Sequence, residues 1–417
     1  MTTGHAVEPL LGWPADETFD AMLVRCAALP AWAPFDARAM AFVERFSRRL
    51  LALRQTRRHP ELAALAHWFR PDTLRRLAAD AVPRDGVVQR GRGLAFTIAP
   101  SNVDSVFLYS CLISLLAGNS NIVRLSQKAS PAIDLVISVL AEVLAEDVGA
   151  PVAGRLVLLT YAHDVAITAA ISRHCHLRVV WGGNATVAAV RAIALRPTAV
   201  ELCFPDRFSA AALEALAVLG SSRTQLEELA WRFALDALQF GQQACSSPRW
   251  LAWVGQRDVI ARAQAVFWPA VEQAVRTRTD KDSGAMHMDR LNAAFAYAAG
   301  QHARPAPGSV PGTWPLRVVT EHGLDDALRD GHCGQGLFVE HQAAQLCDLA
   351  PHFNDRDQTL AVHGFEPAEI LAFVAALGPR AIDRIVPVGQ ALAFSPVWDG
   401  QDLLTSFTRR IHIEWSA

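Results

Sequence analysis

The sequence predicts an α/β protein whose first sheet is parallel and is covered by helices on both faces. Two observations lead to this fold class. Between residues 93 and 204 five short apolar strands alternate with four helices, and further strands and helices follow residue 205. Such an alternation is typical of parallel sheets, in which ligands are expected at the carboxyl ends of the strands.

The elements can be assigned in order along the chain. Residues 1–85 are rich in Ala, Leu and Arg at helical spacing, as in AFVERFSRRLLALRQ, and predict helices. The alternating region predicts strands at 93–99, 121–126, 155–161, 177–183 and 199–204, and helices at 105–118, 131–146, 163–172 and 185–195. Beyond it, we expect helices at 209–219, 229–240 and 257–275, and strands at 249–255, 315–321, 336–340 and 358–365.

These elements suggest an organisation in several parts. We expect a helical region over 1–85, a first domain over 86–205, a second α/β domain over 206–388 and a C-terminal segment over 389–417. The closing RRIHIEW predicts a strand that either returns to the first domain or joins a neighbouring subunit.

The composition describes an ordinary soluble globular protein, with 51% hydrophobic residues, 19% charged residues and a formal charge of -2. No basic excess or Lys/Arg run points to nucleic acid or to an anionic membrane surface. The longest apolar run, 106–118, falls short of the roughly 20 residues that a membrane span needs. The N-terminus lacks the pattern of a secretory signal, and seven irregularly spaced cysteines do not indicate a disulfide framework. We therefore expect a cytoplasmic protein without membrane insertion or a nucleic-acid partner.

The cysteines differ in their surroundings. Cys111 lies in an apolar helix and Cys203 in a strand, so both are expected to pack in a core. The sequence His174-Cys175-His176 lacks a second ligand pair at structural-zinc spacing, and no metal is expected. Cys245 stands in QQACSSP, among small and polar residues between a predicted helix and a predicted strand. It is either a nucleophile or a small hydrophobic residue near a turn.

Polar residues follow the first two strands of the alternating region. Asn102 could donate its amide to a developing oxyanion, or it could cap the following helix. Arg124, Ser126 and Gln127 would suit the ribose and phosphate of a dinucleotide, and a solvated basic rim would look the same.

The later strands carry two more candidates. Trp181, Gly182 and Gly183 precede a predicted helix, so backbone amides could approach a diphosphate, although a tight turn without a ligand is an alternative. The usual GxGxxG pattern does not follow a strand here. Glu201 lies in an apolar strand, near what we expect to be the ligand edge, and is either a general base or a paired structural charge.

Taken together, these segments resemble the acyl-CoA reductase family, the LuxC-type branch of the aldehyde dehydrogenase superfamily. The resemblance covers most of the chain from about residue 90 and is carried by GLAFTIAPSNV, SLLAGNSNIVRLS, VVWGGNATVAAVRAI, FGQQACSSPRW, RDQTLAVHGF, RIVPVGQALAFSPVWDG and LLTSFTRRIHI. It implies an aldehyde-dehydrogenase-like fold, with a Rossmann-type cofactor domain and a second α/β domain that is catalytic.

The resemblance also implies roles for the candidate residues. Cys245 falls at the acyl-accepting nucleophile, Asn102 at the oxyanion amide, and the loop from Trp181 at the cofactor turn. Arg124 stands where many relatives have a ribose-contacting lysine. Gln127 stands where NAD-preferring relatives often carry an acidic residue, and this favours NADPH because repulsion of a 2′-phosphate is absent.

The implied reaction is the NADPH-dependent reduction of an acyl-CoA thioester, fatty acyl in our reading, to an aldehyde through an acyl-cysteine. The acyl donor is coenzyme A or a carrier protein. Glu201 either helps to deprotonate Cys245 or is structural. Two alternatives are an oxidative aldehyde dehydrogenase that uses Glu201 to activate water, and a non-catalytic binding scaffold. The resemblance also leaves room for a homo-oligomer and for a partner enzyme that transfers the acyl group or consumes the aldehyde.

Overall fold

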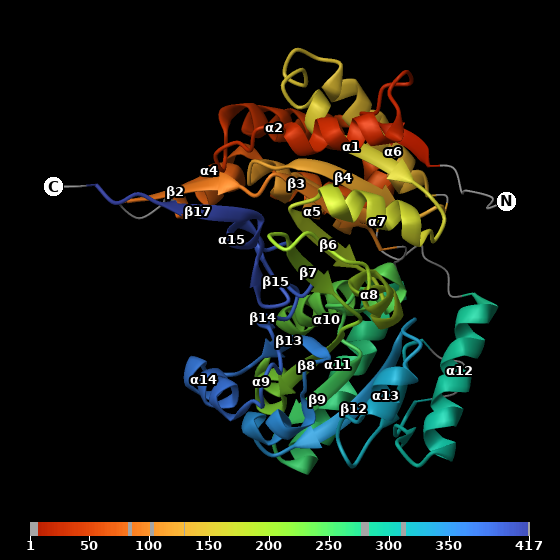
Figure 1. The fold of residues 1–417 in the computed structure, drawn as a ribbon. Helices are drawn as coiled ribbons and strands as arrows, with labels where there is room; N and C mark the ends of the chain where they lie inside the picture. The colour runs from red at the N-terminus through yellow and green to blue at the C-terminus, as the bar shows by residue number, and fades with distance from the viewer. Residues whose placement is uncertain are drawn as a thin grey trace. The chain divides into compact units, whose positions relative to one another are not determined.

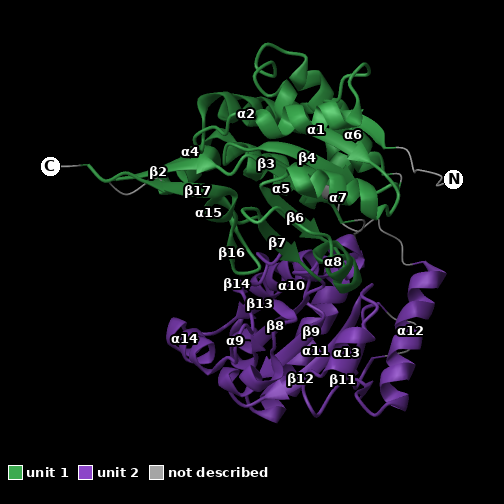
Figure 2. Cartoon of the chain, viewed as in Figure 1, with its two compact units in different colours: residues 1–205, 394–417 green, residues 206–393 purple. Residues whose placement is uncertain are grey.

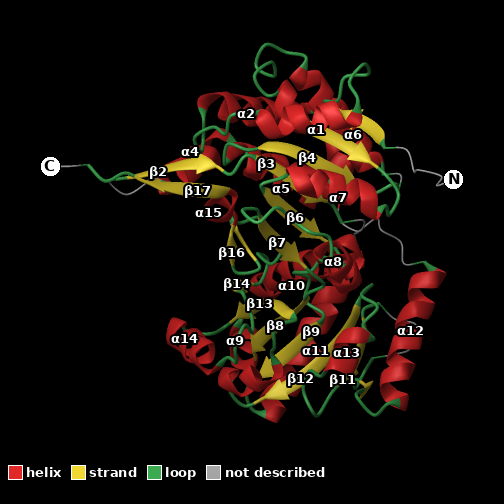
Figure 3. Ribbon diagram, in the orientation of Figure 1, coloured by secondary structure: helices red, strands yellow, loops and turns green. Residues whose placement is uncertain are grey.

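The computed structural model describes residues 7–81, 86–100, 104–128, 130–276, 283–309 and 314–415. The chain divides into two compact units (Figure 2). Unit 1 comprises residues 1–205 and 394–417, and unit 2 comprises residues 206–393. Each unit contains its own sheet, covered by helices (Figure 3).

Unit 1 is built on a sheet in the order β1-β5-β4-β3-β6-β7. Figure 1 labels its strands β4, β3, β6 and β7. All neighbouring strands pair in parallel except β1, which runs antiparallel to β5 at the edge. The strands are β1 (Glu8–Leu11), β3 (Leu94–Ile98), β4 (Ser120–Leu125), β5 (Leu156–Thr160), β6 (Leu177–Trp181) and β7 (Val200–Phe204). The five predicted parallel strands are therefore confirmed, whereas β1 was not predicted.

The order of the strands reverses between β3 and β6. The chain steps from β3 to β4 and β5 on one side and returns to β6 and β7 on the other. Ligands of open α/β sheets bind at such a switch point, beyond the carboxyl ends of the strands. The chain after β3 and the chain after β6 are thus the expected walls of a ligand site in unit 1.

Helices cover both faces of this sheet. Phe96 and Ile98 pack in a cluster that includes residues of the helices at 19–28 and 165–174, while Ala95 joins the cluster on the opposite face. The helices of unit 1 are α1 (Phe19–Ala28), α2 (Ala37–Ala52), η1 (Arg54–Arg58), α3 (Pro60–Trp68), α4 (Pro71–Asp80), α5 (Asp104–Leu116), α6 (Pro131–Leu144), η2 (Ala153–Arg155), α7 (Val165–His174), α8 (Asn184–Arg191) and α15 (Leu403–Phe407). The inner strands β3 and β5 are largely apolar because both of their faces are buried, whereas the edge strands β1 and β7 are less buried.

The C-terminal segment returns to unit 1. Its last strand, β17 (Thr408–His412), pairs antiparallel with β2 (Val87–Gly91) (Figure 1). The short strands β15 (Val397–Trp398) and β16 (Gln401–Asp402) pair with each other. The side chain of Asn119 connects the C-terminal segment to the first domain, since it donates a hydrogen bond to Phe407 O and accepts one from Gly93 N. Of the two fates expected for the terminal strand, return to the first domain is confirmed.

Unit 2 contains a sheet in the order β10-β11-β12-β9-β8-β13-β14, which is parallel except for β10. Its strands are β8 (Phe208–Glu214), β9 (Trp250–Val254), β10 (Arg304–Pro305), β11 (Leu316–Val319), β12 (Leu337–Ala343), β13 (Asp357–His363) and β14 (Arg384–Pro387). Its helices are α9 (Ala215–Gly220), α10 (Arg223–Leu238), η3 (Gln239–Gln242), α11 (Arg257–Arg276), α12 (Gly284–Ala299), α13 (Asp326–Asp330), η4 (Leu346–His352) and α14 (Pro367–Ala376). The second α/β sheet is thus present.

The prediction of one helix over 209–219 is wrong. Residues 208–214 form β8, a central strand between β9 and β13, and the helix α9 begins only at Ala215. Alanine favours helices, and this preference misled the prediction. Burial between two layers decides instead, because Ala210 and Ala212 pack in one core while Ala211 and Leu213 pack in the other.

A buried carboxylate joins α10 to the end of unit 2. Asp236 is 2% exposed and accepts hydrogen bonds from Gly389 N at 2.5 Å and Ala391 N at 3.0 Å. Burial raises the pKa of Asp236 from 3.8 to about 6, and the two backbone donors oppose this shift. The folded protein therefore holds this proton more tightly than the unfolded chain does.

This carboxylate predicts a pH effect on stability. Its contribution is fully present below about pH 4 and is lost as the pH rises toward about 6, because over this range the unfolded chain has already released the proton that the folded state still holds. A shift of this size corresponds to about 3 kcal/mol. Urea unfolding of the wild type and of Asp236→Asn should show the difference between their free energies of unfolding falling across this range. Parallel pH profiles for the two proteins would contradict the assignment.

Within the described residues, no helix combines the length and the apolar character that crossing a membrane requires.

Candidate active site

Cys245 lies in a loop that connects η3 to β9, as the helix-to-strand junction in the sequence predicted. The chain turns sharply before it, with positive φ angles at Phe240 (54°), Gly241 (60°) and Gln242 (64°). The buried side chain of Gln242 holds this turn by donating to Pro248 O at 2.8 Å and accepting from Gly336 N at 2.9 Å. Non-glycine residues in this conformation are costly, so the surrounding hydrogen bonds must fix the loop.

Two neighbouring strands hold the nucleophile candidate itself. The hydroxyl of Ser209 in β8 donates to Cys245 O at 2.6 Å and accepts from Thr359 N in β13 at 3.1 Å. The side-chain amide of Gln358 in β13 donates to Cys245 Sγ at 3.4 Å. Ser209 and Gln358 are each the second residue of their strands. The cysteine therefore sits at the amino ends of the strands of unit 2.

A positive charge lies close to this thiol. Burial lowers the pKa of Arg249, and Coulombic attraction to Cys245, the largest opposing effect, raises it. The Arg249 Nε donates to Gln242 O at 3.2 Å, which keeps the guanidinium beside the loop. A nearby cation favours the thiolate, which is the nucleophilic form of cysteine.

Five other cysteines are placed differently. Burial raises the pKa of Cys26, Cys203 and Cys333 to about 11, and that of Cys111 and Cys175 to about 12. Thiols of this kind are inert. Cys245 is partly exposed and has both a hydrogen-bond donor and a cation nearby.

In unit 1, Arg124 lies near the carboxyl end of β4. Its Nη2 donates to Tyr161 O at 3.0 Å, its guanidinium lies 5.3 Å from the centre of the Tyr161 ring, and burial lowers its pKa. Ser126 follows the strand and accepts a hydrogen bond from Lys128 N, and the side chain of Gln127 is exposed. The structure thus brings this group together at the ligand edge of the sheet.

The turn after β6 has the shape that the sequence predicted. Trp181 ends the strand with its ring stacked on Phe204 at 3.9 Å, Gly182 N donates to Phe204 O, and Gly183 caps α8. A side chain at Gly182 would meet Thr186 at 3.2 Å. The amides of a helix start therefore lie beside the strand-order switch, where they could face an anionic group.

Glu201 lies elsewhere in this sheet. It pairs in register with Arg178, which is the second residue of β6, and so it is not at the carboxyl edge where the sequence placed it. Arg178 Nε donates to Glu201 Oε1 at 2.6 Å, and the guanidinium is buried. Arg191 approaches the other carboxylate oxygen at 3.6 Å. This pairing favours the structural alternative for Glu201.

Asn102 lies outside the described residues, so its contacts with an oxyanion or a helix start are not part of the described site. Within the described ranges, no group of three or more His, Cys, Asp or Glu side chains is arranged to bind a metal ion.

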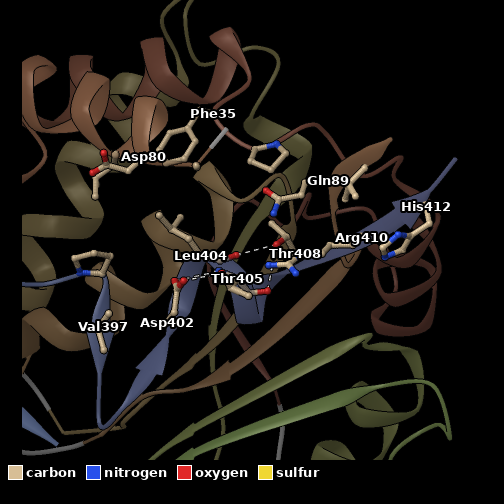
Figure 4. A pocket seen from close by; sticks show the side chains of 15 residues that line it. Phe35, Asp80, Gln89, Val397, Asp402, Leu404, Thr405, Thr408, Arg410 and His412 are labelled. Atoms are coloured by element: carbon tan, nitrogen blue, oxygen red, sulfur yellow. Dashed lines mark hydrogen bonds between the residues drawn. The ribbon is translucent and has the colours of Figure 1, made fainter. Parts of the chain in front are cut away.

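A cavity of about 400 Å³ opens in unit 1 beside β2 and β17 (Figure 4). None of the predicted site residues lines it. Three of its polar side chains serve local structure, since Asp402 caps α15 by accepting from Thr405, and Thr408 donates to Leu404 O at 3.0 Å. We therefore assign the cavity no role in the site.

The sequence did not reveal the supporting residues Ser209, Arg249 and Gln358. Gln358 does lie in RDQTLAVHGF, one of the segments that carried the family resemblance, but nothing in its local pattern relates it to Cys245.

Comparisons with known proteins identify the family and the fold. Residues 42–265 match the family model described as acyl-CoA reductase (LuxC). A search of curated proteins found no match. Solved structures of similar fold include an NAD-dependent aldehyde dehydrogenase from Sinorhizobium meliloti, which is 11% identical with a TM-score of 0.65. The superposition covers 99% of this chain and 92% of the dehydrogenase chain. PnpE from Pseudomonas sp. WBC-3 is 13% identical with a TM-score of 0.64, and 95% of this chain and 90% of PnpE are covered. The fold is that of aldehyde dehydrogenases.

Proposed function

The chain belongs to the LuxC family of acyl-CoA reductases, whose activity is of the aldehyde oxidoreductase kind, and on that premise we propose that it reduces an acyl-CoA thioester to an aldehyde with NADPH. The observation that carries this proposal is Cys245, which is partly exposed and lies beside the donor Gln358 and the cation Arg249. A thiolate that accepts the acyl group is the first requirement of the reaction.

In the step that we propose for Cys245, the bond that forms is matched by a bond that breaks, and the step does not require a metal ion. Its sulfur forms a bond to the thioester carbonyl carbon, the bond from that carbon to the coenzyme A sulfur breaks, and coenzyme A leaves. The negative charge that develops on the carbonyl oxygen needs hydrogen-bond donors, for which we propose Asn102 and the Cys245 backbone N–H. Transfer to water would give a free acid, so exclusion of water protects the acyl-enzyme.

The residues of unit 1 fit a nicotinamide dinucleotide. The turn from Trp181 through Gly183 to α8 offers backbone amides to a diphosphate, and Arg124 offers a charge near the ribose. PnpE has also been solved in complex with nicotinamide adenine dinucleotide. When bound, the cofactor would supply a hydride to the acyl carbon. Gln127 carries no charge to repel a 2′-phosphate, which is why we propose NADPH.

Turnover assays test this proposal directly. Purified protein is mixed with fatty acyl-CoA of several chain lengths and with NADPH or NADH, and cofactor oxidation and aldehyde formation are followed together. We expect one aldehyde for each NADPH consumed, and a kcat/KM at least about tenfold higher with NADPH, which equals about 1.4 kcal/mol. Preference for NADH would overturn the cofactor assignment. Formation of free acid from an aldehyde and NAD(P)⁺ would support an oxidative enzyme instead, and failure of acyl-CoA to add any mass to the protein would support a binding scaffold.

A further inference from the structure

A second side chain contacts the sulfur of the proposed nucleophile. Gln358 Nε2 lies 3.4 Å from Cys245 Sγ, at a distance suitable for an N–H···S hydrogen bond, and Gln358 is only 4% exposed. The two residues are 113 positions apart in the sequence. The contact is therefore made by the fold and not by the local conformation of the loop.

An irregularity in the sheet directs Gln358 toward the loop. In the pairing of β13 with β8, Asp357 lies opposite Phe208 and Thr359 lies opposite Ser209, so Gln358 is one extra residue between two consecutive partners. Such a β-bulge re-aims a side chain and is frequent beside active sites. Strict alternation along β13 would set Gln358 and Thr359 on opposite faces, yet Thr359 Oγ1 lies 3.3 Å from Gln358 Oε1.

Buried charges fix the residue before the bulge. Arg329 binds the Asp357 carboxylate through Nε at 3.1 Å and Nη2 at 2.6 Å, and Asn354 N donates to the same group at 2.8 Å. Arg207 Nη2 donates to Asp357 O at 2.7 Å. Asp383 N donates to Gln358 O at 2.9 Å, so the backbone is held on both sides of the side chain.

Thr359 contacts the other end of the Gln358 amide. Its hydroxyl donates to Gln358 Oε1, so the oxygen of the amide is engaged on that side and the NH2 group faces Cys245. A flipped amide would place an acceptor oxygen against the sulfur, and a thiolate can only accept hydrogen bonds. The orientation in the structure is thus the one that serves a thiolate at Cys245.

We propose that Gln358 is a further catalytic residue of the reaction proposed above, in which its N–H stabilises the Cys245 thiolate and holds Sγ in place for attack on the acyl thioester. During attack, the sulfur forms its bond to the carbonyl carbon, the leaving thiolate departs and takes a proton from water, and Gln358 keeps its own hydrogen. No oxidation or reduction occurs in this step. The amide is equally available when Sγ leaves again as a thiolate.

The charged surroundings of the thiol are compatible with this role. Arg249 is in electrostatic contact with Cys245, and Arg249 in turn interacts with Asp206, Cys333, Tyr297 and His332. Burial holds the pKa of His332 well below its usual value, so this ring is neutral near pH 7. Gln358→Met removes the amide donor without adding or removing a charge.

Alkylation of Cys245 tests the proposal without substrate or cofactor. The rate of reaction with iodoacetamide is measured across pH by peptide mapping, with the six other cysteines as internal references. Gln358→Glu replaces the donor with a carboxylate, so the midpoint of the Cys245 profile should rise by about one pH unit or more, and kcat should fall about 10- to 100-fold. Gln358→Met has a similar length and no donor, and should shift the midpoint in the same direction by a smaller amount.

A matched control lies in the same loop. Gln243 Nε2 donates to Cys333 O at 2.6 Å, so Gln243→Leu removes a loop hydrogen bond that does not involve the Cys245 sulfur, and the midpoint should stay unchanged. If folded Gln358→Met has the wild-type profile, the role of Gln358 is refuted, whether or not the protein reduces acyl-CoA. If the profile shifts while wild-type protein shows no reduction, Gln358 activates the thiol and the proposed reaction fails.

Discussion

Replacement of Cys245 by alanine is expected to lower aldehyde formation from acyl-CoA by about 10³-fold or more, since removing a covalent nucleophile removes the acyl-enzyme route altogether. Cys245 is the partly exposed thiol that the loop, Ser209 and Gln358 hold in one position. Wild-type protein incubated with acyl-CoA in the absence of NADPH should gain the mass of one acyl group, and the Cys245→Ala protein should gain none. Intact-protein mass spectrometry and the turnover assay measure the two effects separately.

Cys333 provides the matched control. Its thiol is also partly exposed and also lies near Arg249, but burial raises its pKa to about 11 and its Sγ donates to the carbonyl of Gly334 at 3.4 Å. Cys333→Ala should therefore keep both the acyl adduct and the turnover. If Cys245→Ala retains turnover, the mechanism does not use Cys245. Loss of the adduct in Cys333→Ala alone would move the nucleophile to that residue.

The strands of unit 1 could be predicted because their pattern has one physical cause. A parallel sheet covered on both faces buries each strand completely, so strands such as Leu94–Ile98 and Leu156–Thr160 appear as short apolar runs between helices. The same cause misled the prediction at 209–219, where the buried strand is made of alanines and its composition resembles that of a helix. Edge strand β1 pairs antiparallel with β5, and its four residues, EPLL, carry too little pattern to be recognised.

The candidate site could be predicted only in its local parts. The helix-to-strand junction located Cys245, and the turn after β6 located Gly182 and Gly183. Two contacts of Cys245 come from Ser209 and Gln358, which are 36 and 113 residues away, and the contact with Gln358 depends on a β-bulge. Neither a distant contact nor a shift of register leaves a periodic signal. The rule that ligands lie at carboxyl ends of strands also points away from Cys245, which sits at amino ends.

The charge of Glu201 in an apolar strand could be explained by a general base or by a structural ion pair, and its contacts favour the ion pair. Opposite it in the neighbouring strand, Arg178 is 1% exposed and uses its whole guanidinium. Nε donates to Glu201, and Nη1 donates to Ser172 Oγ at 3.1 Å and Ile193 O at 3.0 Å. A buried cation left without its carboxylate is expensive, because its desolvation is no longer offset.

Glu201→Ala is accordingly expected to lower the free energy of unfolding by about 3 kcal/mol or more, as measured by urea unfolding at pH 7. Arg191 is the matched control: its side chain is 66% exposed and 3.6 Å from the same carboxylate, so Arg191→Ala should cost less than about 1 kcal/mol. The double variant Arg178→Met, Glu201→Met should regain much of the loss, since no unpaired charge is left buried. Equal, small costs for Glu201→Ala and Arg191→Ala would show that the pair is not structural. If Glu201→Gln instead stops acid formation from an aldehyde while the free energy of unfolding is unchanged, Glu201 is a general base. That result would support the oxidative alternative, which the ion pair with Arg178 argues against.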